Sequence, residues 1–470
     1  MNVRMLSKHI QVKHFLAVGA GLCMTAGLIL GCSTAVNPSS SSLASGAVDV
    51  PVLITDSPSD QLVSFSLTIN SVVLNNTAGK TASILSTPTT IEVTHLNGIQ
   101  APLVTAKIPA DTYVSATITF SNPQITYIDP TTKLPVVASP VLSTTSFTAT
   151  APSPVTISNS STSLLIDLLA GQSVSISGGT VTVNPVFAIK AVPPLAVPPP
   201  SGRNGTGMEH KGTVVSASGT TLVVQPPSGS NITFTTDSST VYQGVSGLSA
   251  LTAGQLVEVD FTVQTGGVLL ATRVELEPAP PVGQQQNRFE GPVTAVASGS
   301  FKMALMQGLG PVVSPTATGN IFTITTNSST VFATAPQFTS LSGLPFTPTF
   351  NSATLTPGQA VGVAASSISG TTAVAASVHL IPQTISGAVT AKSSSSGFIT
   401  YTVTLTSGSA FASLSGATTI TVYTSSATAV PTNAPAIAVG STVRFNGLIF
   451  KTSTGFAMVA GVCPDGDPKI

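Results

Sequence analysis

Short stretches in which apolar and polar residues alternate recur along this chain. Residues 63–69 read Val-Ser-Phe-Ser-Leu-Thr-Ile, and a similar alternation runs through residues 113–120 and 181–189. Successive side chains of a β-strand point to opposite faces of a sheet, so the pattern predicts strands with one buried and one solvated face. Turn-forming clusters, such as residues 57–60 and 129–132, separate these stretches. The expected fold class is therefore all-β.

The composition argues against helices. Charged residues make up 7% of the 470 residues, whereas an ordinary soluble domain contains about 25%. Amphipathic helices need Glu and Lys in phase with Leu and Ala, and Glu and Lys are scarce here. The abundant Thr and Val suit a pleated sheet, and 40 Gly and 35 Pro residues supply turns.

The charge balance excludes one class of partner. The chain has 16 basic and 16 acidic residues, and Arg4, Lys8 and Lys13 precede the cleavage site proposed below. The mature chain would then carry 13 basic residues (16 minus 3) against 16 acidic ones. Because nucleic acid is bound through clustered Lys and Arg, no nucleic-acid partner is expected.

The first 32 residues have the layout of an export signal. A basic stretch leads into the uncharged residues 15–30, and Ile-Leu-Gly-Cys stands at residues 29–32. This ending resembles the lipobox of bacterial lipoproteins. The resemblance implies cleavage between Gly31 and Cys32, a diacylglycerol on the Cys32 thiol, and, with Ser33 next, release to the outer membrane. The alternative is an uncleaved membrane helix, for which about 17 apolar residues is the lower limit.

The remaining cysteines predict no disulfide in the mature chain. Cys23 lies within the leader, and Cys463 then has no partner. Residues 33–47, rich in Ser, are interpreted as a flexible tether.

Residues 48–192 are predicted to form a β-sandwich domain. The segments Thr-Asp-Ser-Pro at 55–58, Lys-Ile-Pro-Ala-Asp-Thr-Tyr at 107–113 and Asn-Pro-Val-Phe at 184–187 resemble domain of unknown function 4382, which stands at the front of many exported bacterial lipoproteins. That family usually has Gly where Asp111 stands, at a left-handed turn position that Asp tolerates.

A Pro/Gly linker, residues 193–208, precedes a part of the chain that repeats itself. Thr-Thr-Asp-Ser-Ser-Thr-Val at 235–241 is echoed by Thr-Thr-Asn-Ser-Ser-Thr-Val at 325–331. Leu-Thr-Ala-Gly-Gln at 251–255 is echoed by Leu-Thr-Pro-Gly-Gln at 355–359 and, more loosely, by Ile-Ala-Val-Gly-Ser at 437–441. We expect the Gly of this turn to have a positive φ.

The repeats predict three small units, each large enough to fold separately, over residues 209–278, 289–382 and 383–464, with a linker at 279–288 and a tail at 465–470. Each unit opens on a glycine followed by a strand, and these glycines are Gly212, Gly291 and Gly387. The units resemble domain of unknown function 5666, and the resemblance implies that each is a small OB-like β-barrel.

Catalytic motifs are missing from the sequence. It contains no Gly-x-Ser-x-Gly, Ser-x-x-Lys, paired-Cys, P-loop or dinucleotide motif. His95, His210 and His379 fall in different predicted domains and are interpreted as surface or turn residues. We therefore predict that the protein is not an enzyme.

Acidic residues offer few binding sites. Asp465 and Asp467 could start a calcium site, but calcium needs six to eight oxygens, so no metal site and no cofactor are predicted. Asp56 and Asp60 bracket Pro58 and are expected to cap its turn. Asp167, in an apolar run, is expected to be half-buried.

Together these features predict a non-enzymatic, lipid-anchored protein of the cell envelope, whose β domains serve surface contact or assembly. Its expected location is the outer membrane, facing the periplasm or the cell surface. Expected partners are the membrane, through the lipid, and an envelope polysaccharide or protein. The alternative is a polysaccharide-binding module, because sandwich and OB-like surfaces bind saccharides. The lack of Trp and the presence of only five Tyr leave few stacking platforms for sugars.

Overall fold

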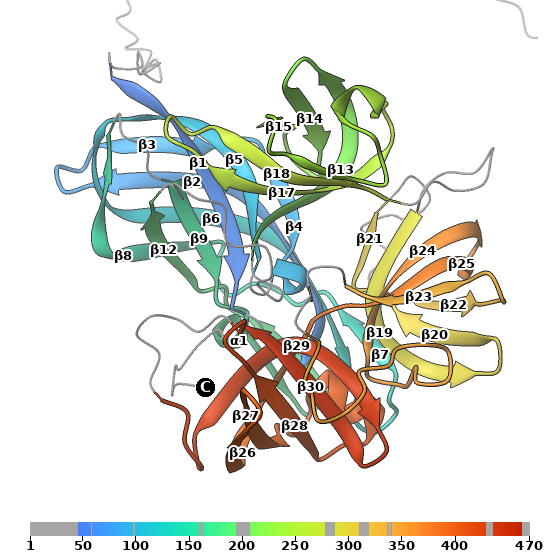
Figure 1. Ribbon diagram of the computed structural model, residues 1–470. Coiled ribbons are helices and arrows are strands. Elements are labelled where there is room, and N and C mark those ends of the chain that lie inside the picture. The colour runs from blue at the N-terminus through green and yellow to red at the C-terminus, as the bar shows by residue number, and fades with distance from the viewer. Residues whose placement is uncertain are drawn as a thin grey trace, which may run out of the picture. The chain divides into compact units, whose positions relative to one another are not determined.

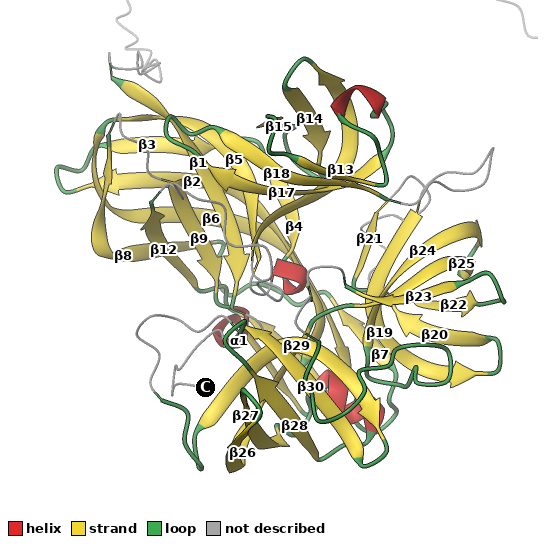
Figure 2. Cartoon of the chain, viewed as in Figure 1, coloured by secondary structure: helices red, strands yellow, loops and turns green. Residues whose placement is uncertain are grey.

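The computed structural model describes residues 46–57, 59–96, 99–158, 163–193, 207–277, 287–309, 319–335, 338, 341–428 and 436–462. Their regular secondary structure is nearly all β-strand, which confirms the all-β prediction (Figure 2). The described helices are short: η1 (Thr94–Leu96), α1 (Ala170–Ser173), η2 (Leu248–Ala250) and α2 (Ala410–Ser415). No helix in this part of the chain is long and apolar enough to cross a membrane. Gly31, Cys32, Cys463, Asp465 and Asp467 lie outside the described residues.

The N-terminal part is a two-sheet sandwich (Figure 1). One sheet has the order β12-β9-β1-β5, and the other has the order β3-β2-β6-β7, with β4 on β2 and β8 on β6. The two sheets enclose one apolar core, in which Phe65, Phe120 and Ile166 are fully buried. The strands are β1 (Ala47–Asp56), β2 (Leu62–Asn76), β3 (Thr81–Leu85), β4 (Thr89–Glu92), β5 (Ile99–Pro109), β6 (Asp111–Ile128), β7 (Pro135–Ala138), β8 (Ser146–Ile157), β9 (Ser163–Leu168), β12 (Phe187–Val192) and the separate hairpin β10 (Val174–Ser177) and β11 (Thr180–Val183).

The turn before β6 differs from the expectation for Asp111. This residue does not have a positive φ; it begins the strand instead. Its carboxylate accepts hydrogen bonds from the Thr112 amide (2.7 Å) and from Asn76 Nδ2 (2.8 Å). The Tyr113 hydroxyl donates to the Pro109 carbonyl (3.0 Å), so one side chain closes the corner from within the core.

Beyond the sandwich, the repeats form strands of similar length and order. The first contains β13 (Gly207–Ser218), β14 (Thr221–Gln225), β15 (Ile232–Thr235), β16 (Val241–Gln243), β17 (Leu256–Val263) and β18 (Leu269–Leu276). The second contains β19 (Asn287–Ala297), β20 (Ser300–Ala304), β21 (Gln307–Leu309), β22 (Ile321–Thr325), β23 (Val331–Thr334), β24 (Ala360–Ser369) and β25 (Thr372–Leu380). The third contains β26 (Gln383–Ser395), β27 (Phe398–Leu405), β28 (Thr419–Thr424), β29 (Thr442–Thr452) and β30 (Gly455–Val462).

All three repeats close the same ring of five strands. In the third, the ring runs β26-β27-β28-β30-β29 and returns to β26, with β28 and β30 parallel. The first repeat follows the same path through β13, β14, β15, β18 and β17, with β15 and β18 parallel. The second follows it through β19, β20, β22, β25 and β24. A five-stranded ring of this kind is OB-like, as the resemblance to domain of unknown function 5666 implied.

The repeated sequence motifs are turns that this ring requires. The hydroxyls of Thr240, Thr330 and Thr428 each accept the amide at the start of their turn and donate to a carbonyl of the ring's last strand. Gly254, Gly358 and Gly440 have φ values of 89°, 95° and 90°, which confirms the expected positive φ. The repetition is thus accounted for by folding alone.

The opening glycine of each repeat is required by close approach of two strands. A Cβ on Gly212, Gly291 or Gly387 would run into a backbone carbonyl oxygen of the neighbouring strand, at Gln225, Ala304 or Thr404 respectively. At these positions the first strand of the ring lies so close to its neighbour that only glycine fits without a shift of the backbone.

The sandwich and the first barrel share a sheet. The start of β13 pairs in parallel with the start of β5, so hydrogen bonding continues from one into the other. Leu53 and Leu165 of the sandwich also pack into the apolar cluster of the first barrel.

Candidate functional site

Charged side chains converge on one place, beside the first two barrels. Four short segments carry them: Glu-His-Lys at 209–211, Glu-Val-Asp at 258–260, Arg-Val-Glu-Leu-Glu at 273–277 and Arg-Phe-Glu at 288–290. In each segment the charged residues alternate with a residue of the barrel interior, such as His210, Val259, Val274 and Phe289, all of which are buried. The alternation therefore places the charges on the outer face of the barrels.

Strand register brings these charges together in rows. Across β13 and β17, Lys211 lies opposite Glu258, and Glu209 lies opposite Asp260. Across β17 and β18, Asp260 lies opposite Arg273. Strand β19 of the second barrel adds Arg288 and Glu290 from the other side.

The three basic residues each contact several carboxylates. Lys211 Nζ lies 2.9 Å from Glu209, 3.5 Å from Glu258 and 3.3 Å from Glu290. Arg273 pairs with Glu258 at 2.6 Å and with Asp260 at 2.7 Å, and it also contacts Glu275. Arg288 lies 3.1 Å from Glu290 and also contacts Glu277.

We call these residues the charge cluster. It comprises Glu209, Lys211, Glu258, Asp260, Arg273, Glu275, Glu277, Arg288 and Glu290. Six carboxylates and three cations make up this group of described residues, so full ionisation would give the nine side chains a net charge of −3 (3 minus 6). Most of these side chains are well buried, with Glu290 5%, Glu258 7% and Glu209 11% exposed. Uncompensated charge in such a place is costly.

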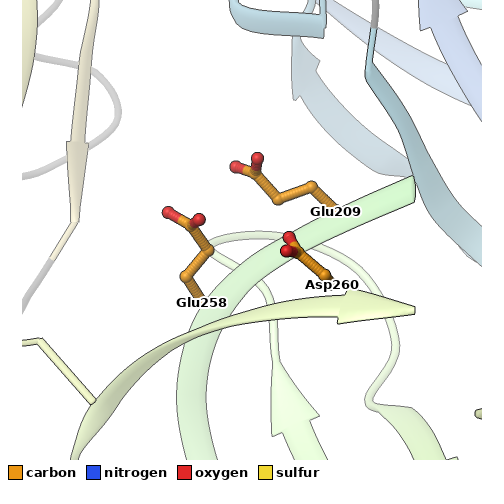
Figure 3. A group of neighbouring side chains, drawn as sticks. All are labelled: Glu209, Glu258 and Asp260. Atoms are coloured by element: carbon orange, nitrogen blue, oxygen red, sulfur yellow. The ribbon is translucent and has the colours of Figure 1, made fainter. Parts of the chain in front are cut away.

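Figure 3 shows the densest part of the charge cluster, where the carboxylates of Glu209, Glu258 and Asp260 approach one another. One oxygen from each lies within 4.8 Å of the others, close enough for a metal ion. Lys211 and Arg273 already contact these carboxylates, and the arrangement does not by itself assign a metal.

The surroundings shift the pKa values of two neighbouring acids, Glu209 and Glu258, in opposite directions. Burial, with the nearby charge of Glu258, raises the pKa of Glu209 to about 7. Burial also acts on Glu258, but the charges of Lys211, Arg288 and Arg273 outweigh it and lower the pKa of that carboxyl to about 2. Burial therefore favours the protonated form of Glu209, whereas the neighbouring cations favour the ionised form of Glu258.

The structure corrects the roles expected for two aspartates. Asp56 is buried, and its carboxylate accepts the amide of Ala170 at the start of α1 (3.3 Å). Asp60 accepts the amide of Ser386 in the third barrel (2.9 Å), a residue 326 positions away. Both therefore bind backbone groups that are distant in sequence, rather than capping the turn between them. Asp167 is half-buried, as expected, and accepts the Ser57 hydroxyl (3.2 Å).

For one of the three histidines, the structure contradicts the interpretation as a surface or turn residue. His210 is 5% exposed and packs on Phe234 inside the first barrel, so its interpretation as a surface or turn residue was wrong. Burial and the nearby charge of His95 lower the pKa of His210 to about 3, which keeps it neutral. His95 pairs with Glu92 at 3.0 Å, and His379 lies within β25.

The charge cluster was not singled out from the sequence, although a signal was present. In a chain with 7% charged residues, four segments of the form charged-x-charged are a clear departure from the background. On strands, that spacing places two charges on one face. Which of these segments come together depends on how the strands of each barrel close into a ring. The spacing of charges within one segment does not specify this.

Comparison with known protein families finds the two families that the sequence motifs resemble. Residues 47–224 match the family described as Domain of unknown function (DUF4382), a range that covers the sandwich and runs on into β14 of the first barrel. Residues 211–275 match Domain of unknown function (DUF5666), which covers the first barrel. A search of curated proteins found no match. The chain is therefore similar to these two families over parts of its length, and they are the two families that its motifs resemble.

Proposed function

We propose that this chain is a non-enzymatic protein of the cell envelope, held in the outer membrane by a lipid on Cys32, with β domains that serve contact or assembly. The observation that supports a structural role is that several buried charged groups contact more than one module. Asp60 joins the sandwich to the third barrel, and the charge cluster joins strands of the first two barrels. These groups hold modules together, which favours a structural role over acid–base chemistry.

The lipid anchor is tested by labelling cells with radioactive palmitate. Wild type and Cys23→Ala are expected to incorporate label, because Cys23 is removed with the leader. Cys32→Ala is expected to lose incorporation and to keep its leader, since the thiol that receives the diacylglycerol is gone. Equal labelling of wild type and Cys32→Ala would contradict the anchor.

A second candidate function, binding of a neutral polysaccharide, is favoured by one surface of the sandwich. We call it the hydroxyl face; it lies on β2, β3, β6 and β8 and consists of Ser71, Asn75, Thr81, Ser83, Ser115, Thr117, Thr119, Ser146, Thr148 and Thr150, with Val73 among them. Cross-strand hydrogen bonds order it: Ser71 to Thr119 at 2.6 Å, and Thr117 to Thr148 at 3.2 Å. Each hydroxyl keeps capacity for a further hydrogen bond, and none of these residues carries charge.

Glycan-array binding of the chain lacking residues 1–32 tests this candidate. Saturable binding to neutral glycans, competed by free sugar, is expected. The double variant Thr117→Lys/Thr148→Lys should abolish it, because two ammonium groups would then occupy the middle of the hydroxyl face. The matched control is Thr404→Lys/Thr419→Lys, an exposed cross-strand pair on the third barrel. If both double variants bind like wild type, the hydroxyl face is not the binding surface.

A further inference from the structure

One residue inside a long strand of the sandwich has a left-handed backbone conformation. In the part of the chain that the structure describes, glycine occupies most positions with positive φ, and the exceptions are Asn122 (φ 52°), Lys133 (φ 58°) and Ser396 (φ 53°). Lys133 and Ser396 lie in turns between two paired strands, β6 and β7 or β26 and β27. Asn122 instead lies within β6. A left-handed residue that is not glycine is a reason to look for a function at its position.

The unusual backbone belongs to a pair of β-bulges between β2 and β6. Opposite the single residue Leu67 of β2, strand β6 has two residues, Asn122 and Pro123. A second bulge follows on β2, where Asn70 is the extra residue. A bulge takes a side chain out of the alternation of its strand. Here Pro123 is buried and Asn122 is exposed, and because the inner side of this sheet is the sandwich core, the Asn122 side chain lies on the outer side.

The bulges adjoin one end of the hydroxyl face. Ser71 and Thr119, joined by a hydrogen bond of 2.6 Å, are the members of that face nearest to them along β2 and β6. The row continues with Ser121, whose hydroxyl donates to Asn70 Oδ1 (3.1 Å). Asn122 comes directly after Ser121, so a ligand that lies along the hydroxyl face reaches Asn122 at this end.

The protein itself does not use the side-chain amide of Asn122. No hydrogen bond joins this amide to the part of the chain that the structure describes. Other turn asparagines bind their own backbone: Asn327 Oδ1 accepts the Ser329 amide (2.9 Å), and Asn351 Oδ1 accepts the Ala353 amide (2.9 Å). Glycine would adopt the φ of Asn122 with less strain. Folding alone therefore does not account for an asparagine at this position.

We propose that Asn122 is a specificity-determining residue of the hydroxyl face, whose amide binds two neighbouring hydroxyls of one sugar in a neutral polysaccharide. This inference rests on the second candidate function given above. An Asn amide presents an acceptor oxygen and a donor NH₂ group side by side in one plane. Each sugar hydroxyl both donates and accepts, so one hydroxyl donates to the amide oxygen while its neighbour accepts from the NH₂ group.

The hydroxyl face and the Asn122 amide then have different tasks. Ser and Thr hydroxyls rotate to suit their partner, so a row of them tolerates many arrangements of sugar hydroxyls. The amide is planar, and its two polar atoms match hydroxyls on adjacent carbons of one ring. A few polar groups fixed in this way usually set the specificity of a binding site. Neither Asn122 nor any member of the hydroxyl face is charged, so an acidic sugar would gain no cation there.

Glycan-array binding of the full chain in detergent tests this assignment, with neutral glycans printed in two forms. One form is native. The other is oxidised with periodate, which cleaves the bond between carbons that carry neighbouring hydroxyls, and is then reduced with borohydride so that no aldehyde remains. Wild type is expected to bind the native form about tenfold more tightly, as the loss of one or two hydrogen bonds implies. Asn122→Gly should bind the native form about tenfold more weakly than wild type and lose most of this preference.

Glycine is the sharpest replacement because it removes the amide and keeps the backbone conformation. The matched control is Ser396→Gly, which removes an exposed side chain at nearly the same φ in a hairpin of the third barrel. This control should bind both forms as wild type does. Thermal unfolding followed by circular dichroism should place both glycine variants close to wild type, so that a change in binding does not report a loss of fold.

Two results would overturn the assignment and leave the polysaccharide function in place. One is an Asn122→Gly protein that binds and discriminates like wild type while Thr117→Lys/Thr148→Lys does not bind. The other is a wild-type protein that binds native and oxidised glycans equally. A wild-type protein that binds no glycan of either form would overturn the function and the assignment together.

Discussion

Replacing Lys211 with methionine is expected to lower the free energy of unfolding by about 3–5 kcal/mol, the usual cost of removing one partner from a buried ionic network. Methionine keeps most of the side-chain volume, so the loss reports charge rather than packing. Three carboxylates, Glu209, Glu258 and Glu290, would lose the ammonium group they share. The effect should be larger at pH 8 than at pH 5, because protons can replace the missing cation at acid pH.

Urea denaturation of the chain lacking residues 1–32, followed by circular dichroism, measures this loss. The control is Lys107→Met, which breaks a pair with Asp49 in which the side chains are 62% and 49% exposed. An exposed pair contributes about 0–1 kcal/mol, so this control should unfold close to wild type. If Lys211→Met and Lys107→Met unfold alike, the charge cluster does not stabilise the fold.

Replacing Gly212 with alanine is expected to destabilise the first barrel by at least about 1–3 kcal/mol, the range seen when atoms are forced into a packed interior. The added Cβ would meet the Gln225 carbonyl and the Val224 side chain, and the carbonyl belongs to backbone that cannot rotate away. The barrel must then open its first hairpin or move β14. The same argument holds for Gly291 in the second barrel and Gly387 in the third.

The matched control lies on the same strand. A Cβ on Gly207 would meet nothing within 4 Å, and its φ is not positive, so Gly207→Ala should be nearly neutral. Thermal unfolding followed by circular dichroism compares the two variants. A Gly212→Ala protein as stable as Gly207→Ala would mean that β13 and β14 do not approach as closely as the structure has them.

The alternation of apolar and polar residues predicted many of the strands, because this alternation is a property of each strand by itself. Alternation in residues 63–69 indicated β2, and the repeated Leu-Thr-x-Gly-Gln turns predicted glycines with positive φ, as found at Gly254 and Gly358. The repeats themselves could be read because each unit needs the same turns to close the same ring. In these cases the physical cause lies within a few residues of the signal.

What could not be predicted depends on contacts far apart in sequence. Asp60 appeared to cap a local turn, but its partner, the Ser386 amide, is 326 residues away. His210 appeared polar and exposed, but strand register turns it into the barrel, against Phe234. The charge cluster joins four segments that meet only after two rings have closed. Its charges were visible in the sequence, but their convergence was not.

The mass of the mature protein, extracted from the membrane fraction and compared with the cytosolic fraction, tests the proposed envelope role most directly. The account predicts a chain in the membrane fraction that begins at Cys32 and is heavier than its amino acids by a diacylglycerol and a further acyl group. Unmodified chain with residues 1–31 still attached, recovered from the cytosol, would contradict it.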